Sequence, residues 1–136
     1  MKAYVNGVEI VLSQDEVDAR AEVGKIGLLP YVAQLRWKKE ISGAAWNGRQ
    51  IDTDRESGQP KLLGEFVAIF TGQRVDPSPW KFADGVWLML SNSDMGAVCL
   101  AARQYIASVY EIEAQITAAI AAGTITTTAE IDAAFA

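Results

Sequence analysis

Short alternating runs of hydrophobic and polar residues flank three turn-forming pairs, Asn6-Gly7, Asn47-Gly48 and Asp84-Gly85. Asn-Gly and Asp-Gly between β-prone runs favour hairpins, because these residues tolerate a positive φ. The pattern therefore predicts three β-hairpins. In the third, the strand from Val86 to Leu90 is apolar on both faces, which predicts a strand that pairs centrally or lies between two layers.

The segment after the first hairpin predicts a short helix. Ser13 and Glu16 have the spacing of a capping box, so the helix is expected over residues 14–23. Gly24 and Gly27 follow and are expected to loosen the chain, which makes this point a candidate hinge.

Two more helices are expected before the third hairpin. Pro30 suits the first turn of one helix and Gly43 its end. Residues 59–71 carry apolar side chains at helical spacing, with Pro60 near the start.

The last third of the chain predicts a long helix that begins at a Ser91 or Ser93 cap and ends at Gly123. Such a helix is about 45 Å long at 1.5 Å per residue, longer than a small mixed domain needs for its own core. A Thr-capped short helix follows, folded back as a helical hairpin. Apolar residues of the long helix recur at alternating intervals of four and three and form a heptad seam: Val98, Ala102, Tyr105, Val109, Ile112, Ile116 and Ala119. The seam can pair within the chain, with a second copy or with another protein.

This order of elements predicts an α+β fold. A small antiparallel sheet built from hairpins packs against helices, with a long helix near the carboxyl terminus and a short terminal helix. Residues 1–35 are expected to form a small hairpin-helix unit, and residues 36–136 a second α+β domain.

Composition narrows the functional classes. The chain has 136 residues, a net charge of -5, no histidine and one cysteine, Cys99. The acidic balance disfavours nucleic acid as a partner, and the lack of a long uncharged apolar window disfavours a membrane span. Cys99 lies among apolar residues, where a buried and inert thiol is expected. Phosphate-binding glycine motifs are absent from the sequence, and we expect no cofactor.

Three carboxylates stand on alternate positions at Asp52, Asp54 and Glu56. Such a set can hold a metal ion, but magnesium and calcium need several converging oxygen ligands, and the calcium-loop pattern does not fit. Asp54 stands directly before an expected helix, where its carboxylate can accept hydrogen bonds from the first amides. We therefore predict a cap or turn at Asp54, and neither a metal site nor catalytic residues.

Four tryptophans are many for a chain of this length. Trp46 and Trp80 flank hairpins and are expected to pack in the core. A role in partner binding stays open for one of Trp37 or Trp80, because exposed aromatic residues often anchor interfaces.

Three stretches together resemble an uncharacterised domain family of tailed bacteriophages and prophages. They carry Gly48, Ile51, Thr53, Asp54, Arg55 and Ser57; Trp80, Asp84, Gly85 and Trp87; and Glu113, Ile120, Ala121 and Ala122. The resemblance covers about residues 36–132, and the first 35 residues fall outside it. Members of this family are often encoded beside tail-fibre proteins or fused to them.

The resemblance implies a non-enzymatic tail-fibre assembly chaperone or accessory protein that binds the fibre protein. Such a protein would act in the host cytoplasm during assembly, and either leave or stay in the virion tail. An apolar helical stripe can cover fibre surface before assembly. The alternative is a permanent baseplate or tail-fibre connector. A third reading is a small metal-dependent hydrolase that uses Asp52, Asp54 and Glu56.

Overall fold

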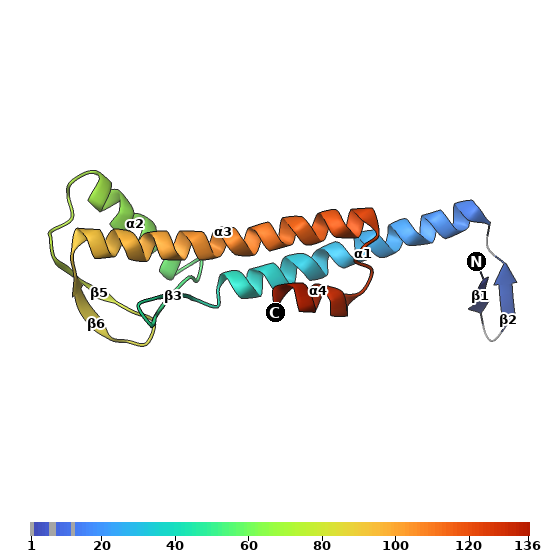
Figure 1. Cartoon of the computed structure of the whole chain (residues 1–136), viewed down its shortest axis with the longest axis horizontal. Helices are drawn as coiled ribbons and strands as arrows, with labels where there is room; N and C mark the ends of the chain where they lie inside the picture. Colours follow the sequence, from blue (N-terminus) through green and yellow to red (C-terminus); the bar gives the residue numbers. More distant parts are fainter. Residues whose placement is uncertain (1, 6–7, 12) are drawn as a thin grey trace.

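The computed structural model describes residues 2–5, 8–11 and 13–136. Its elements are β1 (Lys2–Val5), β2 (Val8–Val11), α1 (Gln14–Glu40), β3 (Ala44–Trp46), β4 (Arg49–Ile51), α2 (Gly58–Phe70), β5 (Ser78–Lys81), β6 (Trp87–Leu90), α3 (Asn92–Ala122) and α4 (Thr128–Phe135). Figure 1 shows α1 and α4 lying along the carboxyl-terminal half of α3, with α2 and the hairpins β3–β4 and β5–β6 around its amino-terminal half. The predicted α+β class is confirmed.

The ends of α3 follow from local chemistry. The Ser91 hydroxyl accepts a hydrogen bond from the Asp94 amide at 3.0 Å, and Gly123 ends the helix with a φ of 78°. Glycine adopts this left-handed conformation without the steric cost that a side chain would add. The short terminal helix starts as predicted, because the Thr127 hydroxyl accepts from the Glu130 amide at 3.2 Å.

One helix, α1, replaces the two helices that the sequence predicts before residue 43. It runs through Gly24, Gly27 and Pro30, so the expected hinge and the expected start at Pro30 are wrong. A helical glycine costs only about 1 kcal/mol, which tertiary contacts can outweigh. At this point Lys25 donates to the Ala121 carbonyl at the end of α3 at 3.2 Å, and from Leu28 onward α1 packs against the other helices.

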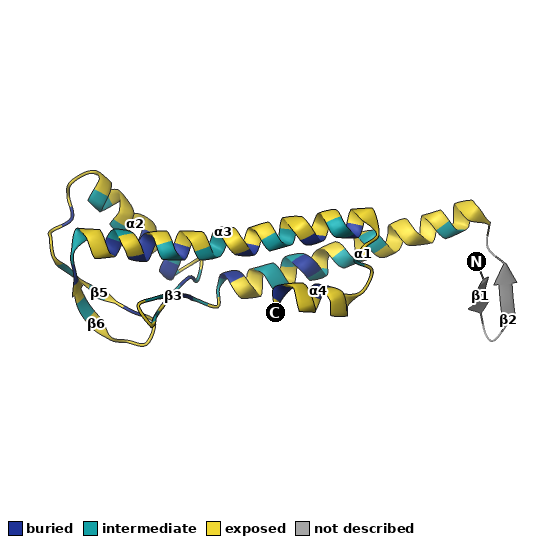
Figure 2. Cartoon of the chain, in the orientation of Figure 1, coloured by how far each residue is buried: buried dark blue, intermediate teal, exposed yellow. Residues whose placement is uncertain are grey.

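Before Lys25, α1 is exposed almost all round and extends past the ends of α3 and α4 (Figures 1 and 2). The expected division of the chain after residue 35 falls inside this continuous helix. That division stays a prediction.

Two clusters of buried apolar side chains line α3. The head core surrounds its amino-terminal half and consists of Ala44, Ile51, Leu62, Phe82, Leu90, Met95, Val98, Cys99 and Ala102. The stem core surrounds its carboxyl-terminal half and consists of Val32, Val109, Ile116, Ile120, Ile131 and Phe135. Tyr105 lies between them and packs against both. The heptad seam of α3 is therefore filled from within the chain, one of the three outcomes that the sequence left open.

The hairpins remain separate two-stranded units. Asn47 and Gly48 have φ values of 49° and 73°, which confirms the second predicted turn. At the third turn Gly85 has a φ of 84°, and Asp84 Oδ1 accepts from the Val86 amide at 3.1 Å. The strands β1 and β2 pair antiparallel, but the expected turn residues Asn6-Gly7 lie outside the described residues.

The strand β6 pairs with β5 alone, so the expectation of a central or sandwiched strand is wrong. One face, with Leu88 and Leu90, turns toward the head core. The other face exposes Trp87 and Met89, each 62% accessible, because no further layer of the described chain covers it.

Candidate functional site

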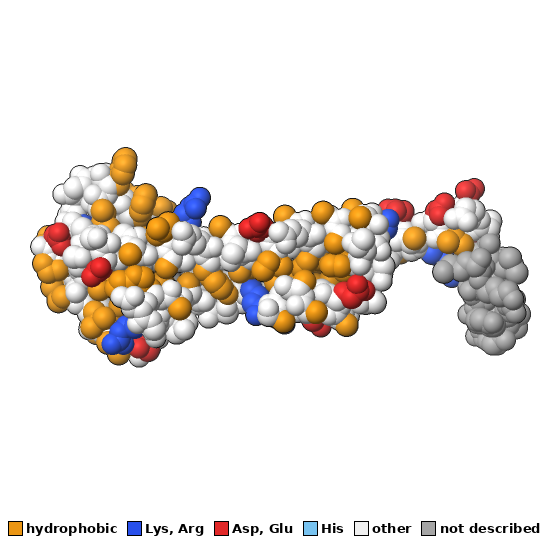
Figure 3. Space-filling model, in the orientation of Figure 1, with side chains coloured by type: hydrophobic (Ala, Val, Ile, Leu, Met, Phe, Trp, Pro, Cys, Tyr) orange, Lys and Arg blue, Asp and Glu red, His pale blue; other side chains and the backbone are white. Residues whose placement is uncertain are grey.

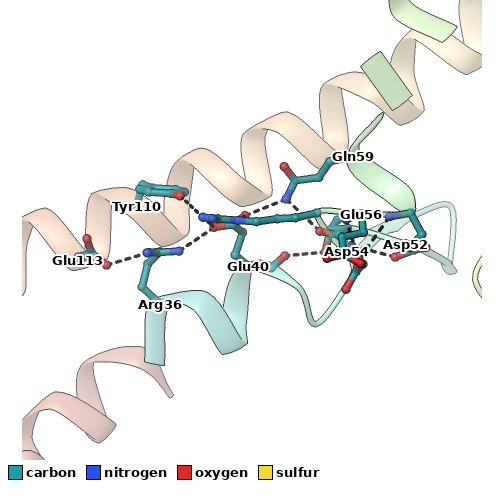
Figure 4. A network of polar contacts seen from close by, with 11 residues as sticks. Arg36, Glu40, Asp52, Asp54, Glu56, Gln59, Tyr110 and Glu113 are labelled. Atoms are coloured by element: carbon teal, nitrogen blue, oxygen red, sulfur yellow. Dashed lines mark hydrogen bonds and ion pairs between the residues drawn. The ribbon is translucent and has the colours of Figure 1, made fainter. Parts of the chain in front are cut away.

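The carboxylate of Glu40 lies at the end of α1 and is only 2% exposed. It accepts hydrogen bonds from Arg36 Nη1 at 2.8 Å, from Arg55 Nε and Nη2 at 2.6 and 2.8 Å, and from Gln59 Nε2 at 2.8 Å (Figure 4). The bonds from Arg55 hold the pKa of Glu40 at about 2, against an ordinary value of 4.5. A buried charge is tolerated only when it is paired in this way.

The two arginines extend this network to α3. Arg36 Nε donates to Glu113 Oε2 at 2.9 Å, and its guanidinium lies 4.7 Å from the ring centroid of Tyr110. Arg55 Nη2 donates to the Tyr110 hydroxyl at 2.7 Å. The network therefore fastens the end of α1 and the segment before α2 to the middle of α3.

The carboxylates of Asp52 and Asp54 accept hydrogen bonds from nearby groups of the same chain. Asp54 Oδ1 accepts from the amides of Glu56 and Ser57 at 2.8 and 3.3 Å. Asp52 accepts from the Asp54 amide at 2.8 Å and from the Ser57 hydroxyl at 2.7 Å. Asp54 thus satisfies the turn that leads into α2, as predicted, although the N-cap position itself is Ser57. In the described part of the chain, no three His, Cys, Asp or Glu side chains are placed to hold a metal ion.

Close packing also holds the segment between Glu40 and Gly58, which connects α1 to α2 and which we call the junction. The buried Thr53 hydroxyl donates to the Glu40 carbonyl at 2.6 Å and accepts from the Gly43 amide at 3.0 Å. A side chain at Gly58 would lie 1.9 Å from the Asp52 carbonyl oxygen, so only glycine fits. The arrangement fixes how the chain passes from α1 to α2. Its charged groups bind one another, which suits a structural role.

Exposed apolar surface lies elsewhere, on the outward side of β5–β6. The strand register places Pro79 beside Met89 and Lys81 beside Trp87. We call these four residues the hairpin face. Lys81 Nζ lies 5.9 Å from the centroid of the Trp87 ring. Tryptophan and methionine are enriched at protein-binding surfaces, whereas lysine is depleted there, so Trp87 and Met89 make this face a candidate interface.

A groove of about 740 Å³ separates this hairpin from α2. Lys61 and Glu65 line it from α2, and Trp80, Lys81 and Trp87 line it from the hairpin. Trp80 Nε1 is buried and has no hydrogen-bond partner among the described residues. Trp80 packs against the head core, as expected, and also lines the groove.

The helix α2 presents a second apolar surface. Leu63, Phe66, Val67 and Phe70 are 63%, 53%, 49% and 83% exposed and follow one face at intervals of three, one and three residues. We call this set the α2 stripe. The sequence pattern predicted the helix but did not separate its buried side, with Leu62, from this exposed side.

A family model described as Domain of unknown function (DUF4376) matches residues 25–135. The chain belongs to the DUF4376 family. The matched DUF4376 region begins in α1, where Lys25 contacts the end of α3, whereas the motif resemblance covers about residues 36–132. Comparison with curated proteins and with solved structures finds no match.

Within the DUF4376 region, most seam residues predicted to bind a partner are covered. Val98, Ala102, Val109 and Ile116 are at most 4% exposed, because α1, α2 and α4 pack over α3. They are inaccessible to a partner in this conformation. The remaining seam residues, Tyr105, Ile112 and Ala119, are half-buried.

The hydroxyl of Tyr105 is 2.6 Å from the Lys39 carbonyl oxygen and donates to it, which ties α3 to α1. Trp37 is 45% exposed on α1, and its role in partner binding stays a prediction. Trp46 stacks on Phe82 with ring centroids 6.1 Å apart, which confirms its packing role. None of the helices in the described residues has the length and apolar character needed to cross a membrane.

Proposed function

We propose that this DUF4376 protein is a non-enzymatic accessory protein, or assembly chaperone, of phage tail fibres. It binds the fibre protein through the hairpin face and the adjoining groove. The link to fibres rests on the sequence resemblance. The observation that carries the binding role is the exposure of Trp87 and Met89, each 62% accessible, on a strand that the rest of the chain holds in place.

Rigid mounting of the hairpin supports this proposal. Arg74, with its side chain 3% exposed, donates through Nη1 to the Leu90 carbonyl at 3.0 Å and through Nη2 to the Ser78 carbonyl at 3.2 Å. Its Nε donates to Glu65 of α2 at 2.6 Å. One guanidinium therefore clamps both strands to α2. A surface that is ordered before binding loses less conformational entropy when a partner docks.

The chemistry of the surface suits a polypeptide partner. Tryptophan is enriched among interface residues that dominate binding energy, and methionine adapts its shape to a partner. The groove adds Lys61, whose ammonium group can pair with polar groups along a bound segment, whereas Glu65 is engaged by Arg74. The saturated network around Glu40 supports a non-enzymatic role, because its charged groups are engaged within the chain.

Co-expression with a candidate tail-fibre protein, chosen from the genes beside this one, tests the proposal. The two proteins should co-elute on size exclusion, and fibre solubility should fall when the accessory protein is omitted. Trp87→Glu with Met89→Glu should abolish co-elution. If the protein elutes alone while the fibre folds equally well without it, the proposal fails.

A permanent connector of the tail is the second candidate. It is favoured by the length of α3, whose 31 residues separate the head core from the far end of the stem. Mass spectrometry of purified virions distinguishes the two roles. A connector remains in the particle, whereas a chaperone that leaves after assembly does not.

A further inference from the structure

The α2 stripe is an uncharged apolar surface that no element of the described chain covers. Figure 3 shows hydrophobic side chains gathered over α2 in the head of the molecule. Within the stripe, the rings of Phe66 and Phe70 stack with centroids 6.5 Å apart and form one continuous aromatic surface. Leu63 and Val67 form an aliphatic surface beside the two rings, since residues four apart on a helix are neighbours.

The order of these side chains makes the stripe complementary to itself. When two copies of α2 run antiparallel about an axis between positions 66 and 67, Leu63 faces the second copy's Phe70, and Phe66 faces its Val67. Each contact then joins one aromatic and one aliphatic side chain. A parallel arrangement would instead place Phe70 against Phe70, the bulkiest and most exposed position against itself.

Charge does not oppose such a pairing. The charged residues of α2 are Lys61 and Glu65, and both line the groove toward the hairpin instead of the stripe. Glu65 is also paired with Arg74 at 2.6 Å. Two chains that each carry a net charge of -5 can therefore meet along α2 without like charges from this helix at the contact.

The exposed area of the α2 stripe is sufficient for a small, reversible interface. The four side chains are about half to four-fifths exposed. With about 200 Å² for each large apolar side chain, the stripe offers roughly 500 Å² per copy. With all of this area buried, two copies would remove roughly 1,000 Å² from solvent, which is the minimum for a biological interface and is typical of weak, reversible complexes.

We propose that a second copy of this chain docks on the α2 stripe and forms a twofold-symmetric dimer with antiparallel α2 helices. The pairing does not depend on fibre binding, because the hairpin face lies on other elements and stays free. The dimer would present two hairpin faces to its surroundings.

Light scattering after size exclusion tests the dimer over a concentration series from about 1 to about 100 µM. The expected mass at the upper end is twice the 14.7 kDa of one chain. Phe66→Glu with Phe70→Glu should raise the dimer dissociation constant at least about 100-fold, since each copy would bury unpaired charge. The matched control is Trp87→Glu with Met89→Glu, two equally apolar exposed positions on the hairpin face, which should leave the dimer intact.

Cysteine cross-linking tests the geometry without introducing charge. Leu63→Cys combined with Phe70→Cys should give a covalent dimer on oxidation, because each thiol faces the other position of the second copy. Within one chain these positions are about 10 Å apart along the helix, too far for a disulfide. Leu63→Cys alone should not cross-link.

A wild-type chain that stays at monomer mass throughout the series overturns the proposal. So does a dimer that persists in the glutamate variant, since another surface would then hold it. Cross-linking of Leu63→Cys alone, or a double variant that forms no covalent dimer on oxidation, contradicts the antiparallel arrangement.

Discussion

Replacing Glu40 by glutamine removes the charge at the centre of the junction while it keeps the shape of the side chain. Its pKa lies at about 2, against 4.5 ordinarily, because Arg55 bonds to the ionised form. At 1.36 kcal/mol per pKa unit this difference corresponds to roughly 3 kcal/mol. The side chain of Arg55 is 48% exposed, so water screens part of the interaction. We expect Glu40→Gln to lower the free energy of unfolding at pH 7 by about 2 to 3 kcal/mol.

The pH dependence of this loss follows from the direction of the shift. The pKa of Glu40 is lowered on folding, so its contribution is fully present above pH 4.5 and disappears as the pH falls toward 2. The stability difference between wild type and Glu40→Gln at pH 3 should be less than about half of its value at pH 7. Urea unfolding followed by tryptophan fluorescence at both pH values measures it.

Glu56→Gln is the matched control, because Glu56 is exposed in the same segment and its side chain makes none of the junction's ion pairs. Its stability should lie within about 0.5 kcal/mol of wild type. Equal stability of Glu40→Gln and wild type at pH 7 would refute the account of the network. A loss that is the same at pH 7 and pH 3 would show that packing, and not charge, is responsible.

Three further predictions concern the close-packed parts of the fold. Gly58→Ala should lower the free energy of unfolding, measured with urea, by about 2 to 3 kcal/mol, since its Cβ would lie 1.9 Å from the Asp52 carbonyl oxygen. Gly64→Ala, which has open space around it, should raise the free energy of unfolding by about 0.5 to 1 kcal/mol. Ile131→Ala should cost about 2 to 5 kcal/mol and speed proteolysis of α4, because Ile131 is fully buried in the stem core. Burial raises the pKa of the Cys99 thiol, so a thiol reagent should modify the folded protein slowly and the urea-unfolded protein rapidly; fast modification without urea would contradict this burial.

Features set by a few neighbouring residues were predictable from sequence. Asn47-Gly48 forms its turn because both residues take a positive φ, and Gly123 ends α3 for the same reason. Ser91 and Thr127 cap their helices through bonds to the amide three residues ahead. Such local chemistry does not depend on the rest of the chain.

Features set by distant residues were not predictable. Local propensity predicts a break at Gly24 and Gly27, but α1 runs through both glycines. Contacts with α3 and α4, such as the hydrogen bond from Lys25 to the Ala121 carbonyl, support the continuous helix. Glu40 gains its donors from positions up to 19 residues away, and no motif marks such a pairing.

The exposure of the α2 stripe could not be predicted from the sequence for another reason. Apolar spacing shows that a helix is amphipathic, but not which part of a wide apolar arc the core will cover. Leu62 turns into the head core, whereas Leu63 and Phe66 do not. The same holds for β6, where Trp87 is exposed because no further layer of the described residues covers it.

The most direct test of the proposed function is calorimetric titration of the purified tail-fibre protein with this protein. We expect saturable binding that Trp87→Glu with Met89→Glu weakens at least about 100-fold. Phe66→Glu with Phe70→Glu should leave the affinity of each chain for the fibre protein unchanged, although the variant is expected to be monomeric. Absence of binding heat at several temperatures, or equal affinity of the hairpin-face variant and wild type, would contradict the claim that the hairpin face binds the fibre.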